Sequence, residues 1–234
     1  MKQLTDLKIY VPYGSRSYAN WISNNFVNSV EEADLVLITG GEDINPRIYG
    51  EQSHSSTWYN IRRDEIELTA IKEAIQQEKF LWGTCRGIQL LCAVAGGKLV
   101  QDMNHSYTHS VITNEGVVMA TNSLHHQMQY PFDLVEGEDY HILAYARGLS
   151  KERGVPYYGG ANDEQMILPV DKDGYTIEPE ICFYPKIRAL GHQAHPEMML
   201  GSPNYKPMVD YSKSILTKLI NNTLKIETLV CLNS

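Results

Sequence analysis

The segment at residues 80–97 constrains the fold more than any other part of this 234-residue chain. It opens with the apolar run Phe-Leu-Trp, continues through Gly-Thr-Cys-Arg-Gly, and becomes apolar again from Ile88 onwards. This order predicts a buried strand, a sharp turn and a helix. Cys85 lies at the centre of the turn, between glycines that remove the Cβ atoms which would collide with neighbouring backbone. The pattern indicates a nucleophile elbow with cysteine at its tip, and the alternative is a packing cysteine in an ordinary strand-to-helix turn.

Strand and helix patterns alternate through the first half of the chain. Apolar runs at 8–13 and 33–39 predict strands, and apolar residues at helical spacing predict helices over 17–30 and 62–79. This alternation is typical of an α/β fold with a parallel sheet. The charged residues at the start of the second helix are expected to be its solvated first turns: Arg62, Arg63, Asp64, Glu65 and Glu67.

Shorter segments follow in the second half. A last helix is expected over 209–225, a loop or lid over 148–163, and an antiparallel pairing of 166–170 with 180–184. We find no repeat, linker or change of composition, so we expect one domain over residues 1–234. Further strands are expected at 98–100, 111–113, 117–120, 141–146 and 189–195, with the second and third forming a hairpin.

Composition excludes several classes of function. The net charge is −8 and no long basic run occurs, which argues against nucleic acid as a partner. The four cysteines are too dispersed for a disulfide framework, so a reducing, cytoplasmic setting is expected. The N-terminus has no apolar leader and no stretch is long enough to span a membrane, so a membrane partner is not expected either.

Eight histidines raise the question of a metal site. His105, His109, His125 and His126 lie in the polar segment 101–129, but no pair has a zinc spacing joined to a second well-spaced pair. We therefore expect these to be polar loop histidines, and we predict no metal site.

A thiol nucleophile needs a base, and the base needs an orienting group. In the extended segment His195-Pro196-Glu197, the first and third side chains point to the same side, and the proline stiffens the geometry. Alone, these residues favour a surface histidine and a carboxylate at the start of a helix over a functional pair. Together with Cys85 they predict a Cys-His-Glu triad. Gly40 and Gly41, at the carboxyl end of an apolar run, form either a plain turn or a source of oxyanion donors.

These motifs resemble those of class I glutamine amidotransferases, and more closely those of the γ-glutamyl hydrolase branch, of the γ-glutamyl-γ-aminobutyrate hydrolase type. The resemblance is carried by residues 40–51, 63–67, 83–102, 122–127 and 189–197. It implies a single flavodoxin-like α/β domain with a mainly parallel central sheet, helices on both faces and an antiparallel extension. His192 and Ala194 depart from the residues usual at these positions in that branch, which concerns the shape of the pocket near His195.

The resemblance also implies roles for individual residues. Cys85 would attack the γ-carbonyl of a γ-glutamyl amide, His195 would activate the thiol and protonate the leaving amine, and Glu197 would orient the imidazole. Backbone N–H groups of Gly41 (or Gly40) and Arg86 would form the oxyanion hole. No cofactor is implied. Contacts to the glutamyl group would come from Gly40, Gln89, Ser123, Leu124, His125, His126 and Gln127.

Three functions remain open from the sequence. The first is hydrolysis of a small-molecule γ-glutamyl amide through a thioester. The second is a glutaminase that delivers ammonia to a synthetase or ligase on another chain. The third is an inactive module that binds γ-glutamyl compounds. A homodimer is compatible with each of them.

Overall fold

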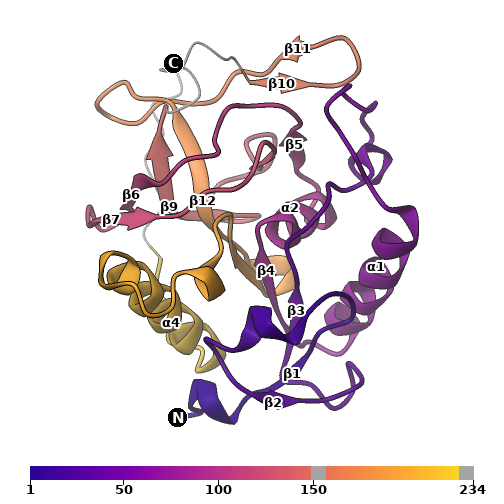
Figure 1. Cartoon of the computed structure of the whole chain (residues 1–234), viewed down its shortest axis with the longest axis vertical. Helices are drawn as coiled ribbons and strands as arrows, with labels where there is room; N and C mark the ends of the chain where they lie inside the picture. Colours follow the sequence, from indigo (N-terminus) through magenta and orange to yellow (C-terminus); the bar gives the residue numbers. More distant parts are fainter. Residues whose placement is uncertain (149–156, 227–234) are drawn as a thin grey trace.

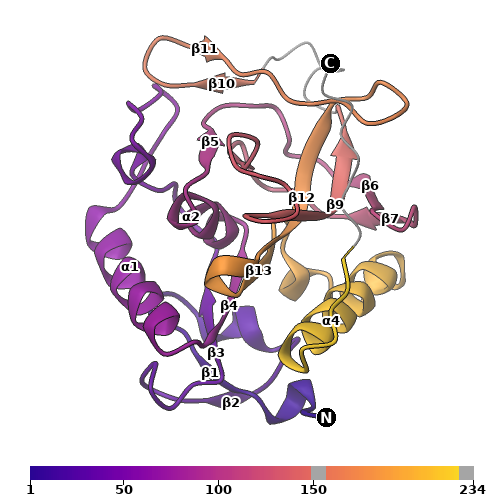
Figure 2. The same cartoon turned by 180° about the vertical axis from the view of Figure 1, so that it is seen from behind.

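The computed structural model describes residues 1–148 and 157–226 and is built on a large twisted sheet (Figures 1 and 2). The strands of this sheet are β1 (Lys8–Tyr10), β2 (Asn25–Phe26), β3 (Leu35–Ile38), β4 (Phe80–Thr84), β6 (His109–Thr113), β7 (Val118–Thr121), β9 (His141–Arg147), β12 (Ile177–Tyr184) and β13 (Ala189–His192). Their order in the nine-stranded sheet is β2-β1-β3-β4-β13-β12-β9-β6-β7. Neighbours from β2 to β13 run parallel. Neighbours from β13 to β7 run antiparallel. The mainly parallel sheet with an antiparallel extension is therefore confirmed.

Helices cover both faces of the parallel half. Helices α1 (Ile61–Gln76) and α2 (Arg86–Val94) lie on one face, and α4 (Lys206–Ile220) lies on the other (Figure 1). Strand β3 shows why both faces are apolar: Leu35 and Leu37 belong to the core beneath α4, whereas Val36 and Ile38 belong to the core beneath α1 and α2. Successive side chains of a strand point to opposite faces, so a continuous apolar run fits a sheet covered on both sides.

Short elements complete the described chain. Strand β5 (Lys98–Val100) pairs with β8 (Met128–Tyr130), and β10 (Tyr158–Gly159) pairs with β11 (Glu164–Gln165). The 3₁₀ turns are η1 (Leu4–Asp6), η2 (Arg16–Ala19), η3 (Pro46–Tyr49), η4 (Pro185–Ile187), η5 (Pro196–Met198) and η6 (Pro203–Tyr205). Within the described residues, no helix combines the length and the apolar character that crossing a bilayer requires.

The helix predicted over 17–30 is wrong. This stretch forms η2, irregular chain and β2, which runs parallel to β1. Two of the apolar residues at helical spacing, Trp21 and Ile22, are buried all the same, and Trp21 packs edge-on against Trp82 with ring centroids 4.9 Å apart. The Ser23 hydroxyl donates to the Thr5 carbonyl and accepts from the Asn25 N–H, so local side-chain bonds replace the helical ones.

The pairing predicted between 166–170 and 180–184 is also wrong. Strand β12 instead pairs with β9 on one side and β13 on the other, which suits a strand that is buried along nearly its whole length. The preceding segment makes only an isolated bridge between Val170 and Thr176, around a turn stabilised by the Asp171 carboxylate. The predicted hairpin is confirmed as β6 and β7. Much of the predicted lid lies outside the described residues.

Candidate active site

The turn between β4 and α2 has strained backbone at its tip. Cys85 has φ 51° and ψ −111°, outside the regions that residues with a side chain prefer. The flanking glycines make the turn possible: a Cβ on Gly83 would lie 2.4 Å from the Ile88 nitrogen, and one on Gly87 would lie 2.1 Å from the Ile38 carbonyl oxygen. The Cys85 N–H donates to the His192 carbonyl at 2.8 Å, which ties the turn to β13. The thiol is thereby fixed at the start of α2, at the carboxyl edge of the parallel strands.

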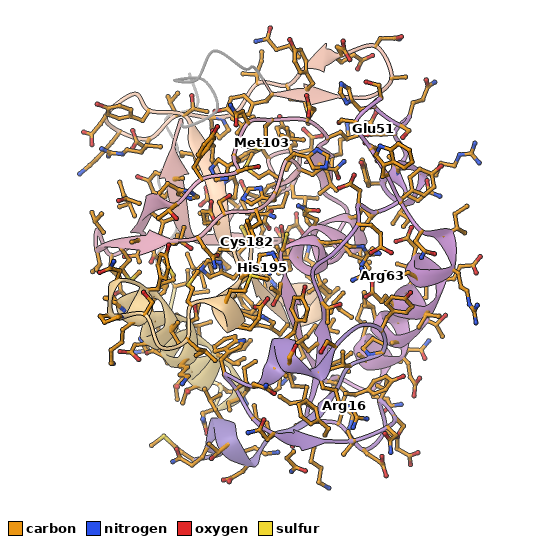
Figure 3. The ribbon with its side chains drawn as sticks, viewed as in Figure 1. Arg16, Glu51, Arg63, Met103, Cys182 and His195 are labelled. Atoms are coloured by element: carbon orange, nitrogen blue, oxygen red, sulfur yellow. The ribbon has the colours of Figure 1, made fainter. Side chains whose placement is uncertain are left out.

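His195 lies directly beyond β13 and links the thiol to a carboxylate (Figure 3 labels it near the centre of the molecule). Its Nδ1 donates to Glu197 Oε1 at 2.8 Å. Burial opposes protonation of the ring, but hydrogen bonds to Cys85 and Glu197 outweigh it and raise the pKa of His195 to about 10. The imidazole is therefore a cation at neutral pH, placed between the thiol and the acid. The structure brings the three residues of the predicted triad together.

Two further side chains surround His195, and sequence reasoning did not select either. Asn122 Oδ1 accepts from the His195 N–H at 2.9 Å, and its Nδ2 donates to the His195 carbonyl at 3.1 Å. The Tyr18 ring, from η2, lies 6.0 Å from the imidazole centroid, and burial together with the Glu197 charge raises the pKa of Tyr18. Asn122 could have been found from its place beside the predicted substrate loop. Tyr18 could not, because its spacing suggested only a core position.

The glycine loop after β3 touches the imidazole. A Cβ on Gly40 would lie 2.8 Å from His195 Cε1, so only glycine leaves room for the ring. Arg63 Nη2 holds the loop by donating to the carbonyls of Gly40, at 2.9 Å, and Thr39, at 3.0 Å. Gly41 has φ 142°, which favours glycine. The Arg86 N–H is in the first turn of α2, where a backbone donor has no intrahelical acceptor. The oxyanion roles of Gly41 and Arg86 stay a prediction.

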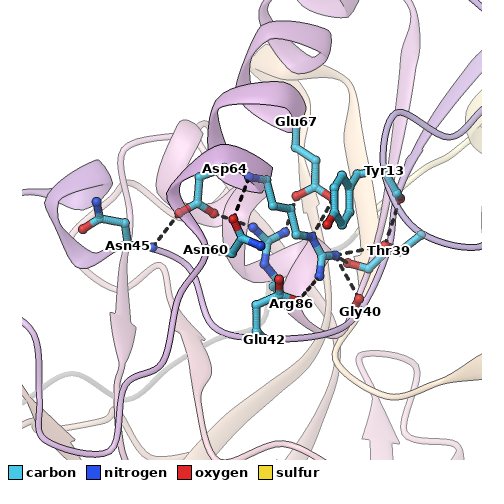
Figure 4. A network of polar contacts seen from close by, with 10 residues as sticks. Tyr13, Thr39, Gly40, Glu42, Asn45, Asn60, Asp64, Glu67 and Arg86 are labelled. Carbon is cyan, nitrogen blue, oxygen red and sulfur yellow. Dashed lines mark hydrogen bonds and ion pairs between the residues drawn. The ribbon is translucent and has the colours of Figure 1, made fainter.

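A buried network of charges supports this loop and the elbow together (Figure 4). Glu67 accepts from Arg63 Nε at 3.2 Å and also pairs with Arg86. Arg86 pairs in addition with Asp64 at 2.5 Å, and Arg63 with Glu42 at 2.5 Å. Burial raises the pKa of Glu67 against the opposing effect of the two guanidinium groups. The network joins the helix that follows the glycine loop to the helix that carries the elbow.

The prediction that these α1 residues form solvated first turns is therefore wrong for Arg63, Asp64 and Glu67, which are buried. Charges at i, i+4 spacing are usually solvated, and the sequence does not show that Arg86 of a second helix lies against them. Arg62 and Glu65 are exposed, as expected.

The predicted substrate-contacting residues separate into distinct environments. Gln89 Nε2 donates to the Gln127 carbonyl at 2.8 Å, so these two buried residues lie together. Leu124 is exposed, and His126 is half-buried with its Nε2 3.2 Å from Asp43. Ser123 and His125 are buried and contact His105 instead of an open pocket.

The histidines at 105, 109 and 125 also differ from the prediction. All three are buried rather than on a polar surface. They surround Glu180 of β12, because His109 begins β6 and a bridge between His105 and His125 brings their two loops together beside it. Residue spacing in the sequence could not predict this cluster, since its side chains come from separate segments of the chain.

Solved structures share the fold over nearly the whole chain. One is PurLQS from Thermotoga maritima, with a TM-score of 0.52 and 15% identity, covering 96% of this chain and 100% of that one. Another is described as a GMP synthase component from Thermoplasma acidophilum, with a TM-score of 0.50 and 15% identity, covering 92% of each chain. At such identities the likeness concerns the fold alone.

Sequence relatives match over shorter segments. A glutamine amidotransferase-like protein, YvdE homolog, of Lactococcus lactis subsp. cremoris is 40% identical over 83 residues, which is 35% of this chain and 44% of that protein. Protein NtpR of Enterococcus hirae is 40% identical over 75 residues, which is 32% of this chain and 31% of that protein. The matched part thus spans less than half of these relatives. Residues 21–197 match the family described as Peptidase C26. The chain therefore belongs to the Peptidase C26 family of class I glutamine amidotransferase-like proteins.

Proposed function

We propose that this protein hydrolyses a γ-glutamyl amide bond through a γ-glutamyl thioester on Cys85. Membership of the family supports a hydrolase or amidotransferase role in general. The observation that carries the finer proposal is the placement of a protonated His195 between the Cys85 thiol and Glu197, with the thiol held at a strained elbow. Such an arrangement activates a sulfur nucleophile and supplies a proton to the leaving group.

The reaction follows from this geometry in two stages. The sulfur of Cys85 attacks the γ-carbonyl carbon, and the carbonyl electrons move to oxygen as the S–C bond forms. Backbone N–H groups of Gly41 (or Gly40) and Arg86 stabilise that oxyanion. As it collapses, the C–N bond breaks and the amine leaves with the proton from His195. Water then attacks the thioester, His195 accepts its proton, and the thiolate and a free γ-carboxylate are released.

We also propose that Gln127, a buried residue of the loop 122–127, contacts the substrate. Gln127 Nε2 donates to the Thr57 hydroxyl at 3.0 Å, whereas its buried Oε1 has no hydrogen-bond partner within residues 1–148 and 157–226. A buried acceptor without a partner is costly, and the α-ammonium group of a glutamyl substrate would satisfy it. Gln89 fixes this residue through the Gln127 carbonyl.

The test compares amide cleavage by the wild type, Cys85→Ala and Cys92→Ala. Burial raises the pKa of Cys92 to about 12, so this thiol is a matched cysteine that is expected to be inert. We expect Cys85→Ala to abolish release of the amine from γ-glutamyl amines, and Cys92→Ala to retain it. Full activity of Cys85→Ala would overturn the proposal.

A second readout is covalent labelling with an electrophilic glutamine analogue, followed by peptide mapping. We expect modification at Cys85 in the wild type and none in His195→Ala at the same exposure. Labelling confined to another cysteine would contradict the assignment.

The second candidate function is delivery of ammonia to a synthetase, because solved structures described as PurLQS and as a GMP synthase subunit share the fold.

Steady-state rates separate the two functions. Fast cleavage of γ-glutamyl amines with slow turnover of free glutamine supports the hydrolase. Glutaminase activity that appears only with an added synthetase chain supports the donor. Binding of γ-glutamyl compounds without cleavage of any would indicate an inactive module.

A further inference from the structure

A second cluster of polar side chains lies in the interior, on the antiparallel side of the sheet. His105 and His125 come from two loops, and Glu180 comes from β12. All three are buried, and one ligand atom of each lies within 4.8 Å of the others. We propose that His105 Nδ1, His125 Nε2 and the Glu180 carboxylate bind a Zn²⁺ ion, which holds the two loops to the sheet.

Both imidazoles are oriented as metal ligands require. His125 Nδ1 lies 2.8 Å from the Gln127 carbonyl, which can only accept, so this nitrogen carries the proton and Nε2 keeps its lone pair. His105 Nε2 lies 2.9 Å from Glu178 Oε2, an ion-pair contact without hydrogen-bond geometry, which leaves Nδ1 to face the other two ligands. In zinc sites the second nitrogen of a ligating histidine is nearly always held by a carbonyl or a carboxylate, as His125 Nδ1 is held here.

Glu180 supplies the third ligand, and one of its carboxylate oxygens is available for a metal ion. Its Oε1 lies 3.7 Å from His105 Nδ1 and accepts from His109 Nε2 at 2.9 Å. Its Oε2 is buried and has no hydrogen-bond partner among the described residues. A carboxylate oxygen left unpaired in the interior is costly, so this atom indicates a ligand that completes it.

The spacing of these atoms is close to that of a tetrahedral site. Zinc bonds of about 2.0–2.1 Å place neighbouring ligand atoms about 3.3 Å apart. The nitrogens of His105 and His125 are 2.8 Å apart, so they would separate by about 0.5 Å. The Oε1 atom of the Glu180 carboxylate is 3.7 Å from His105 Nδ1, and one ligand atom from each of the three residues lies within 4.8 Å of the others, so the carboxylate would approach the imidazoles.

The charges of the cluster favour a dication. Glu178 and Glu180 are two buried carboxylates close to the proposed ion, and a dication there offsets the cost of burying their charges. Two imidazoles and one carboxylate form a donor set found in zinc sites in which a water completes the tetrahedron. All three residues are buried, which keeps a substrate away from the ion, so its role here is to hold the loops.

The proposed zinc site is linked to His195 through the loop 122–127. Asn122, three residues before His125, holds the backbone of His195 by two hydrogen bonds. A metal that fixes the loop 122–127 to β12 thereby fixes Asn122. Its role is to position the loop, and it takes no part in bond breaking.

The test uses tag-free protein refolded in the presence of Zn²⁺ and freed of unbound metal by gel filtration. We expect about one zinc per chain by elemental analysis in the wild type and in His141→Asn, a control on β9 that faces Phe183. Glu180→Gln keeps the shape but weakens a ligand, and His125→Asn removes one. Both should retain less than about a tenth of the metal, since ligand loss costs at least 10–100-fold in affinity.

A Co²⁺-substituted wild type keeps the test independent of whether variants fold. We expect the visible bands of four-coordinate cobalt without a sulfur charge-transfer band, and a zinc-dependent rise in melting temperature. Wild-type protein that binds neither metal would overturn the proposal. Cys85→Ala should bind zinc normally, which separates failure of the metal site from failure of the proposed catalysis; loss of zinc in that variant would also overturn the site.

Discussion

At the scale of residues, two side chains are held in states that free amino acids avoid. Cys85 has a positive φ because the turn on which it lies is enclosed by β3, β13 and α2. His195 keeps its proton because Cys85 and Glu197 both bind the cation. Strain and charge of this kind persist only where the surrounding structure fixes them, which is typical of functional sites.

Replacing Glu197 by Gln tests the charge on His195. The proposed reaction needs protonated His195, so we expect activity to be lost as pH rises through the pKa of His195, about 10 in the wild type. Without the carboxylate this pKa falls, and the alkaline limb of kcat/KM should move to lower pH, with kcat reduced roughly 10²–10⁴-fold. The control is Glu138→Gln, an exposed partner of Lys186, which should leave the profile unchanged. An unmoved alkaline limb in Glu197→Gln would contradict the role of the acid.

His192 provides a test of stability against pH. Burial lowers its pKa from 6.5 to about 4, and its Nδ1 accepts from the Ala194 N–H at 2.9 Å. The unfolded chain therefore binds a proton below pH 6.5 that the folded chain refuses, so the stability it contributes is present above that pH and lost on acidification towards 4. The stability of the wild type relative to His192→Asn should fall by up to about 3 kcal/mol between pH 7 and 4, measured by urea unfolding. A difference independent of pH would show that His192 does not titrate in this way.

At the scale of elements, contacts between segments decide which charged residues are buried. Helix α1 looks amphipathic with a charged first turn, yet that turn packs beneath the glycine loop and against Arg86 of α2. The loop 122–127 looks like one substrate loop, yet its side chains alternate between the surface and a buried histidine cluster. In both cases the partner lies far away in the sequence.

Two ion pairs at the same i, i+4 spacing allow a matched comparison on helices. Arg63–Glu67 is buried in α1, whereas Lys206–Asp210 is exposed in α4. Glu67→Ala leaves two guanidinium groups without their shared partner, so it should lower the free energy of unfolding by about 3–5 kcal/mol. Asp210→Ala should change it by less than about 0.5 kcal/mol. Equal effects in denaturant titrations would mean that the buried network is solvated.

The loop that carries Asn122 is expected to position His195, the proposed catalytic histidine. Asn122→Ala removes both hydrogen bonds to the His195 backbone, so kcat should fall roughly 10–100-fold while KM changes little. Asn122→Asp keeps an acceptor for the His195 N–H and should retain more activity than alanine. Steady-state kinetics give both values, and a change confined to KM would assign Asn122 to substrate binding instead.

At the scale of the whole molecule, one sheet runs through both halves of the chain. Strands from the first half and the second half meet at the parallel β4–β13 contact, directly below the candidate site. The two cores on either face of the sheet share strands, so neither can form without the other. The fold thus brings Cys85 and His195 together across more than a hundred residues.

This shared sheet predicts a single cooperative unfolding transition, as expected for one domain over residues 1–234. Trp21 and Trp82 pack edge-on in the core, and Trp58 is exposed, so fluorescence reports mainly on packing around β4. Fluorescence and far-ultraviolet circular dichroism should give the same midpoint in urea. Two separated midpoints would divide the chain into independent units.

Local sequence patterns were sufficient to predict the features that local chemistry controls. The apolar run at β3, the glycine-flanked Cys85 and the His195-Pro196-Glu197 segment each follow from periodicity or from close backbone contacts, so their elements could be predicted. The stretch at 17–30 could not, because short polar side chains competed with the helix that its apolar spacing favoured.

Features that depend on contacts between distant segments became visible only in the folded molecule. The tertiary structure buried Arg63 and Glu67, set Asn122 against His195, and gathered three histidines around Glu180. A charged or polar side chain is stable in the interior only when a partner meets it there, and the sequence does not state which segments meet. Burial of polar groups is therefore a property of the folded molecule, whereas the strand, turn and helix at Cys85 are properties of the local chain.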